Sequence, residues 1–225
     1  MQIERFSKQL PGIVWNMLLD QRNERLVLEV RQQDQKRVSF WVLDTISKKW
    51  LWEEVEFEES WWLNLHAISE DKIFLNYFTD KSNPDSKKII EVDIAKMEVT
   101  DELKEVPSSN SEKLKPNNLL ISPLHYTEGN PHFDTVKLFI KRIKNHDILK
   151  AVDYMEHDNK VYISYYIYHE RKMDNFLLVV DENGCVIIDE KLGDNLNSVG
   201  LGTFFTYSNT LITVKNKTEI LIYQC

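Results

Sequence analysis

Residues 175–191, NFLLVVDENGCVIIDEK, hold the pattern that decides the fold. An apolar run ends at Val180, the polar residues Asp181–Gly184 follow, and a second apolar run begins after Cys185. Asn-Gly pairs supply the positive φ angles that tight hairpin turns require. β-branched residues on both sides of the turn favour extended strands. The stretch therefore predicts two antiparallel strands joined by a tight turn.

The step from an apolar residue into an aspartate at a strand end recurs at Leu43-Asp44 and at Val92-Asp93. An aspartate side chain can accept hydrogen bonds from backbone groups two residues on and so start a turn. Short apolar and aromatic runs surround each step, and the whole pattern repeats with a period of about 40–50 residues. The strand sets that we expect span residues 13–57, 61–103, 151–191 and 202–223.

A repeat of this length built from four short strands predicts an all-β fold, a small β-propeller of about five blades. The last set has three strands, and Gln2–Phe6 offers an N-terminal strand that closes the last blade and removes two exposed sheet edges. We expect a single β-propeller-like domain over residues 1–225. A β-sandwich or a barrel is the alternative fold.

One segment shows helical periodicity in place of strand alternation. Asn130 suits the N-cap, Pro131 suits the first helical position, and Asp134 suits the first turn. The apolar residues at helical spacing are Phe133, Val136, Phe139, Ile140 and Ile143. The pattern predicts one helix over Pro131–Lys144, inserted where the degenerate blade is expected.

Composition and charge exclude several classes of protein. Of 225 residues, 42% are hydrophobic, which is enough for a buried core. The formal net charge of −8 repels phosphates, so we expect no nucleic-acid partner and no anionic membrane surface. Neither an apolar leader run nor a run of about 18–20 apolar residues occurs. Cys185 and Cys225 are the two cysteines, so we expect reduced thiols in a cytoplasm.

Motifs that would fix a reaction are missing from the sequence. There is no Gly-rich dinucleotide fingerprint, no Gly-Lys-Ser/Thr and no Gly-x-Ser-x-Gly. The six histidines and two cysteines show neither His-Glu-x-x-His nor Cys-x-x-Cys spacing. We therefore expect no cofactor and no metal site, and we assign no catalytic residue.

The segment before the predicted helix is the best local candidate for a binding site. It places His125, Tyr126, Glu128 and His132 close together in the chain, around Gly129. Helix N-termini attract anions, and histidine can exchange a proton near pH 7. The structural reading, which we favour, is a turn at Gly129, a capped helix and packed rings.

Two tryptophans are further binding candidates. Trp15 precedes Asn16, and Trp62 lies two residues before Asn64, in what we expect to be the first strands of two successive sets. In a propeller such strands line the central channel, where aromatic rings with nearby amides suit a small-molecule or peptide pocket. Core packing is the competing and favoured interpretation.

The blade-like repeat and the run His125–Phe133, HYTEGNPHF, resemble a family of uncharacterised bacterial proteins, mainly from Bacteroidetes. The resemblance implies a bacterial cytoplasmic protein and assigns no functional residue.

These observations favour a non-catalytic binding or scaffold module, with an unknown protein or small-molecule ligand as partner. A small-molecule enzyme with its site around His125–Phe133, or a ligand sensor that uses the channel aromatics, is the alternative. The sequence identifies neither the ligand nor the oligomeric state.

Overall fold

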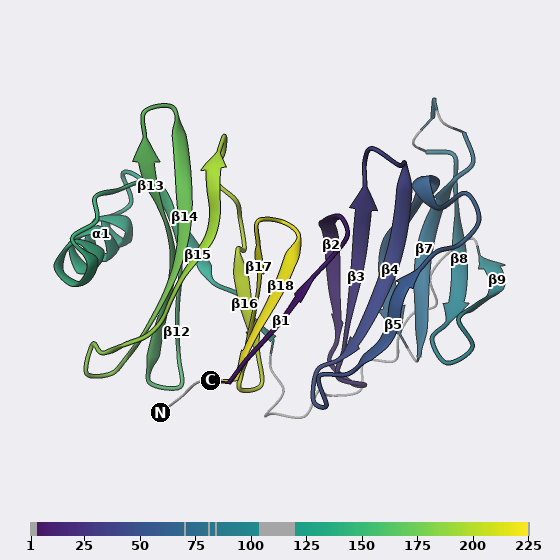
Figure 1. Cartoon of the computed structure of the whole chain (residues 1–225), viewed down its shortest axis with the longest axis horizontal. Helices are drawn as coiled ribbons and strands as arrows, with labels where there is room; N and C mark the ends of the chain where they lie inside the picture. The colour runs from purple at the N-terminus through teal and green to yellow at the C-terminus, as the bar shows by residue number, and fades with distance from the viewer. Residues whose placement is uncertain (1–3, 70, 81, 84, 104–119, 225) are drawn as a thin grey trace. The chain divides into compact units, whose positions relative to one another are not determined.

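The computed structural model describes residues 4–69, 71–80, 82–83, 85–103 and 120–224. The chain divides into two compact units, one formed by Met1–Gln9 with Leu120–Cys225 and the other by Leu10–Leu119. Each unit contains two antiparallel sheets, and most of their strands are labelled in Figure 1. The fold is therefore all-β with a single α-helix in the described ranges, as the sequence predicted. That residues 1–225 form one domain stays a prediction.

The unit Leu10–Leu119 holds two four-stranded sheets, in each of which consecutive strands pair in chain order. The first sheet consists of β2 (Ile13–Asp20), β3 (Arg25–Gln32), β4 (Arg37–Asp44) and β5 (Trp50–Val55). A 3₁₀-helix, η1 (Ser60–Trp62), precedes the second sheet. The second sheet consists of β6 (Leu63–Ser69), β7 (Lys72–Phe78), β8 (Lys87–Asp93) and β9 (Glu98–Leu103).

The other unit holds two five-stranded sheets. One follows the order β11 (Leu124–Thr127), β12 (Ile148–His157), β13 (Lys160–His169), β14 (Lys172–Asp181) and β15 (Val186–Leu196). The other follows the order β1 (Glu4–Gln9), β18 (Glu219–Gln224), β17 (Thr210–Lys215), β16 (Phe204–Tyr207) and β10 (Leu120–Ile121). All four expected strand sets are thus confirmed.

The N-terminal strand completes the last set, as predicted. β1 pairs antiparallel with β18 from Glu4 opposite Gln224 to Gln9 opposite Glu219. It therefore runs further along the chain than the expected segment Gln2–Phe6. Because β18 pairs with β1 on one side and with β17 on the other, it is not an edge strand.

The recurring aspartates start turns, as their positions indicated. Asp44 accepts from the backbone N–H of Ser47, and Asp93 accepts from that of Lys96. Asp181 accepts from the N–H groups of Asn183 and Cys185 in the hairpin between β14 and β15. These local bonds stabilise the turns after β4, β8 and β14, in three of the sheets.

The sequence predicts about five blades, but the part of the chain that the structure describes forms four sheets. Each of the four sheets is open. The strands in the expected fifth interval are too short to form a sheet alone, and they pair with neighbours: β10 with β16, and β11 with β12. Residues 104–119 lie outside the described ranges.

Each unit packs two sheet faces around an apolar core. In the unit Leu10–Leu119, side chains of β3, β4 and β5 meet those of β6, β7 and β8, with Phe40 and Trp52 among the largest buried groups. In the other unit, β12–β15 pack on β16–β18 through Tyr162, Leu177 and Phe204. Alternation along the strands supplies both faces, because successive residues point to opposite sides.

The helix α1 (Pro131–Lys144) begins and ends where the sequence predicts. Asn130 caps it, and the Asn130 side chain accepts a hydrogen bond from the N–H of His132. Phe133, Val136 and Ile140 are buried against the face of the β11–β15 sheet that points away from the β16–β18 core (Figure 1). Over the described residues, no helix combines the length and hydropathy that crossing a membrane would require.

His146 follows α1 and should make stability depend on pH. Burial and the positive charge of Lys144 lower the pKa of His146 below 6.5. The Nδ1 atom of His146 lies 3.0 Å from the Tyr165 hydroxyl oxygen. Because burial also keeps Tyr165 protonated by raising its pKa, the hydroxyl donates to a neutral imidazole.

A lowered histidine pKa contributes stability that is fully present above the unfolded pKa and is lost as pH falls through the folded pKa. We expect the free energy of unfolding of the parent to approach that of His146→Gln as pH falls from about 7.5 to about 5. Urea unfolding of both proteins measures this, and a gap that stays constant or widens on acidification would show that His146 is not held neutral.

Candidate functional site

A cavity of about 400 Å³ lies where α1 meets the β11–β15 sheet, within one unit. We call it the aromatic pocket. Its lining residues are Tyr126, His132, Thr135, Val136, Phe139, Tyr154, Glu156 and Val161. Two residues predicted from the sequence, Tyr126 and His132, are among them. The volume matches a small organic molecule better than a polymer segment.

Ring contacts define the wall of the aromatic pocket. Tyr126 and His132 stack with centroids 5.0 Å apart and an interplanar angle of 28°. Tyr126 also contacts Tyr154, with centroids 6.1 Å apart. These two contacts place the three rings beside one another at the cavity.

One carboxylate lines the same cavity. The hydroxyl of Tyr154 donates a hydrogen bond to Glu156, and burial together with this carboxylate raises the pKa of Tyr154. The phenol therefore stays protonated and donates to Glu156. The pocket thus combines aromatic faces with a single negative charge.

Local structure explains why these groups meet. Tyr154 and Glu156 are two residues apart on β12, so both point to the same face of the sheet. The N-cap at Asn130 fixes the first turn of α1, which places His132 over Tyr126. The sequence pattern predicts the strand and the helix, but it does not single out Tyr154 and Glu156 as site residues. The alternation of Val152, Tyr154 and Glu156 was the signal that could have placed them.

His125 lies apart from the aromatic pocket. It precedes Tyr126 on β11 and so points to the opposite face, where its Nδ1 donates to Asp153 Oδ1 at 2.7 Å. Asp153 is buried, and its second oxygen accepts from both the N–H and the hydroxyl of Thr203, each at 2.8 Å. The histidine therefore joins a hydrogen-bonded cluster between β12 and the residue before β16.

Glu128 is exposed in the turn before α1, where its N–H donates to the carbonyl of Lys150. It is not a lining residue of the aromatic pocket, and neither is His125. The predicted site residues are therefore brought together only in part. An acid–base site made of His125, Glu128 and His132 would require movement of these groups.

The two predicted tryptophans do not form a common pocket wall. Trp15 is 56% exposed on β2, and the Arg31 guanidinium lies 5.1 Å from its ring centroid. The same guanidinium lies 5.5 Å from Trp61. Trp62 lies in η1, not in a strand, because Glu59 adopts a left-handed conformation and turns the chain there. The strand that was expected to begin at Trp61 begins two residues later, at Leu63.

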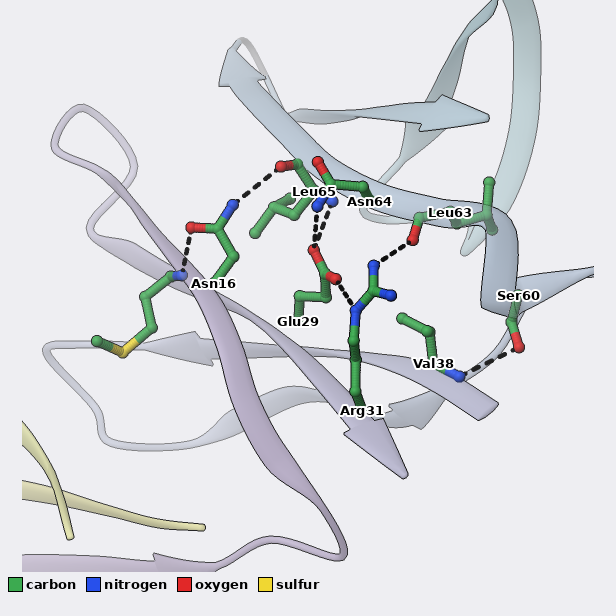
Figure 2. Close-up of polar contacts among 9 residues, drawn as sticks. Asn16, Glu29, Arg31, Val38, Ser60, Leu63, Asn64 and Leu65 are labelled. Atoms are coloured by element: carbon green, nitrogen blue, oxygen red, sulfur yellow. Dashed lines mark hydrogen bonds and ion pairs between the residues drawn. The ribbon is translucent and has the colours of Figure 1, made fainter. Parts of the chain in front are cut away.

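A buried polar cluster lies beside Trp15 and was also missed. The side chain of Glu29 is fully buried on β3, and its oxygens accept from Arg31 Nε at 2.6 Å, from Leu65 N–H at 2.7 Å and from Asn64 Nδ2 at 3.3 Å. Arg31 donates to the Leu63 carbonyl, and Asn16 donates to the Leu65 carbonyl, both at 3.0 Å. Figure 2 shows these contacts, and we call the set the Glu29 cluster.

The Glu29 cluster satisfies the free edge of β6. That strand lies at one end of its sheet, so its outward N–H and C=O groups have no strand partner. Side chains from β2 and β3 take the place of the missing strand. Burial raises the pKa of Glu29, and the Leu65 N–H and the Arg31 charge oppose the shift. In the other unit, the buried carboxylate of Asp153 also accepts from a backbone N–H, that of Thr203.

No group of three or more His, Cys, Asp or Glu side chains in the described residues is arranged to hold a metal ion. The candidate site is therefore described by its rings, its carboxylate and its shape.

Comparison with known proteins adds a family match and similar solved structures. Residues 19–100 match the family model described as Domain of unknown function (DUF4905). A search of curated protein sequences finds no match. The crystal structure of BamB from Moraxella catarrhalis aligns with 95% of this chain and 85% of its own, at 12% identity and a TM-score of 0.28. The family match falls within the first two strand sets and does not include the segment His125–Phe133 that carried the resemblance in the sequence.

Proposed function

We propose that this chain is a non-catalytic binding module whose aromatic pocket holds a small organic cation. The observation that carries the proposal is the placement of Tyr126, His132 and Tyr154 around a cavity with one carboxylate, Glu156. Electron-rich ring faces attract cations, and such walls recognise quaternary ammonium groups. Glu156 supplies the compensating charge.

The cavity is prepared for such a ligand in two ways. The stacked rings need not rearrange, because they already contact one another. The Tyr154 hydroxyl already bonds to the carboxylate, so less side-chain freedom is lost on binding. Binding is favoured over catalysis here because His125 and Glu128, which an acid–base site would use, do not line the cavity.

Choline is the probe for this proposal, and dimethylbutanol, its neutral carbon isostere, is the matched ligand. We expect calorimetry to show choline binding and at least about tenfold weaker binding of the neutral isostere. Glu156→Gln keeps the shape of the side chain and removes its charge, so choline affinity should fall by about tenfold.

Asp147→Asn is the control, because it removes one exposed carboxylate that pairs with Lys141 outside the pocket. It should leave choline affinity unchanged. Equal affinity for choline and its isostere, or equal loss in both variants, would contradict a cation site at Glu156.

We also propose that the four sheets are blades of a small β-propeller. Two features support this. Each sheet is built around a meander of strands that are consecutive in the chain, and the last one is completed by the N-terminal strand β1. A blade shared by both chain ends is a common way to close a propeller without exposing strand edges.

A further inference from the structure

A second cavity, of about 470 Å³, lies in the unit that contains the aromatic pocket but shares no lining residue with it. We call it the amide pocket. β13, β14, β15, β17 and the loops at residues 197–203 and 216–217 contribute to its lining. Its side chains differ from those of the aromatic pocket, because most of the polar groups are amides and hydroxyls.

Asn175 lines the amide pocket and carries an unused acceptor. The residue is 4% exposed, and its Nδ2 donates to Ser164 Oγ at 2.8 Å and to the Tyr165 carbonyl at 3.1 Å. Because the Tyr165 carbonyl can only accept a hydrogen bond, the amide atom beside it must be the donor Nδ2. The other amide atom of Asn175 is therefore the acceptor Oδ1. Across the described part of the chain, no group donates a hydrogen bond to this Oδ1.

Tyr166 presents a matching donor. Its side chain is buried, and its hydroxyl oxygen accepts from the N–H of Gly200 at 2.8 Å. Burial raises the pKa of this phenol, so the proton is retained. The structure gives that proton no acceptor among the residues that it describes. The hydroxyl can therefore donate to a ligand or a water molecule in the amide pocket while it still accepts from Gly200.

Both groups lie side by side. Tyr166 and Asn175 are opposite each other in the pairing of β13 with β14, so their side chains share one face of the sheet. From this juxtaposition we infer that the amide pocket binds a neutral, hydroxyl-rich small molecule, such as a saccharide or cyclic polyol. A ligand hydroxyl can accept from Tyr166 and donate to Asn175 at the same time.

The remaining lining fits that chemistry. Lys217 is the one charged side chain among the lining residues. Asn195, Asn197 and Asn216 add amides, while Leu192 and Val214 add apolar surface. Amides bond to hydroxyl groups, and the apolar residues can contact the C–H face of a sugar ring. The inference is independent of the organic-cation proposal, since the two cavities are separate.

The test uses the whole chain, with D-glucose, maltose and myo-inositol as hydroxylated probes and tetrahydropyran as the ring without hydroxyl groups. NMR spectra are recorded during titration into the millimolar range. At least one hydroxylated probe should shift the Asn175 side-chain amide and the Gly200 N–H signals in a saturable manner. Tetrahydropyran should shift neither of them.

Tyr166→Phe removes the donor, and we expect it to weaken binding by about tenfold. Tyr165→Phe is the matched control, because it removes a buried hydroxyl from the same strand on the opposite face. The titration of the parent protein decides the question even if a variant folds poorly. No saturable shift with any hydroxylated probe would mean that water alone completes these groups, and would overturn the inference. Equal affinity in Tyr166→Phe would overturn it as well.

Discussion

Removing residues 1–9 is expected to lower the melting temperature by about 6–12 °C or to cause aggregation. β1 covers the whole length of β18 through six residue pairs, and cross-strand pairs contribute about 0.5 kcal/mol each. Without β1, the edge of β18 is exposed beside the fully buried residues Ile220, Leu221 and Ile222. An exposed apolar strand edge can pair with another chain.

Removal of residues 1–3 alone is the matched control, because it leaves β1 whole. That variant should melt with the parent protein in calorimetry and remain monodisperse. If the longer deletion also melted with the parent, the pairing of β1 with β18 would contribute nothing to the stability of this unit.

Glu29→Ala is expected to lower the free energy of unfolding by about 3–5 kcal/mol. The substitution removes three accepted hydrogen bonds at a fully buried position and leaves the Leu65 N–H without its acceptor. It also leaves Arg31, whose side chain is 15% exposed, without its carboxylate. Urea unfolding followed by tryptophan fluorescence measures this effect.

Glu102→Ala is the control, because Glu102 pairs with Lys88 while both side chains are more than half exposed. Such surface pairs contribute about 0–1 kcal/mol. The conservative variant Glu29→Gln should lie between the two, since it keeps an acceptor for Leu65 and loses the charge. A loss no larger for Glu29→Ala than for Glu102→Ala would mean that the Glu29 cluster does not hold β6.

Much of the fold could be predicted because local chemistry determines it. The aspartate turns and the alternating apolar runs located every strand set, and Asn130 with Pro131 located the start of α1. Boundaries shifted where long-range pairing decides them. β1 extends to Gln9 because β18 offers partners that far, and no local signal near Gln9 records this.

The candidate site could be predicted less well, because it depends on which faces meet. Alternation shows that His125 and Tyr126 point to opposite sides of β11. It does not show that α1 covers the side of Tyr126, or that Tyr154 on the paired strand lies near that ring. Similarly, Trp62 followed a strand-like pattern, but the left-handed residue Glu59 places it in η1.

The most direct test of the central claim is an NMR titration of the whole chain with choline, which shows where an organic cation binds. The account predicts saturable shifts at Thr135, Phe139, Tyr154 and Val161, which line the aromatic pocket from α1, β12 and β13. The same titration of Glu156→Gln should produce much smaller shifts at equal choline concentration. Shifts absent from these residues, or confined to other acidic surfaces of the protein, would contradict a cation-binding role for the aromatic pocket.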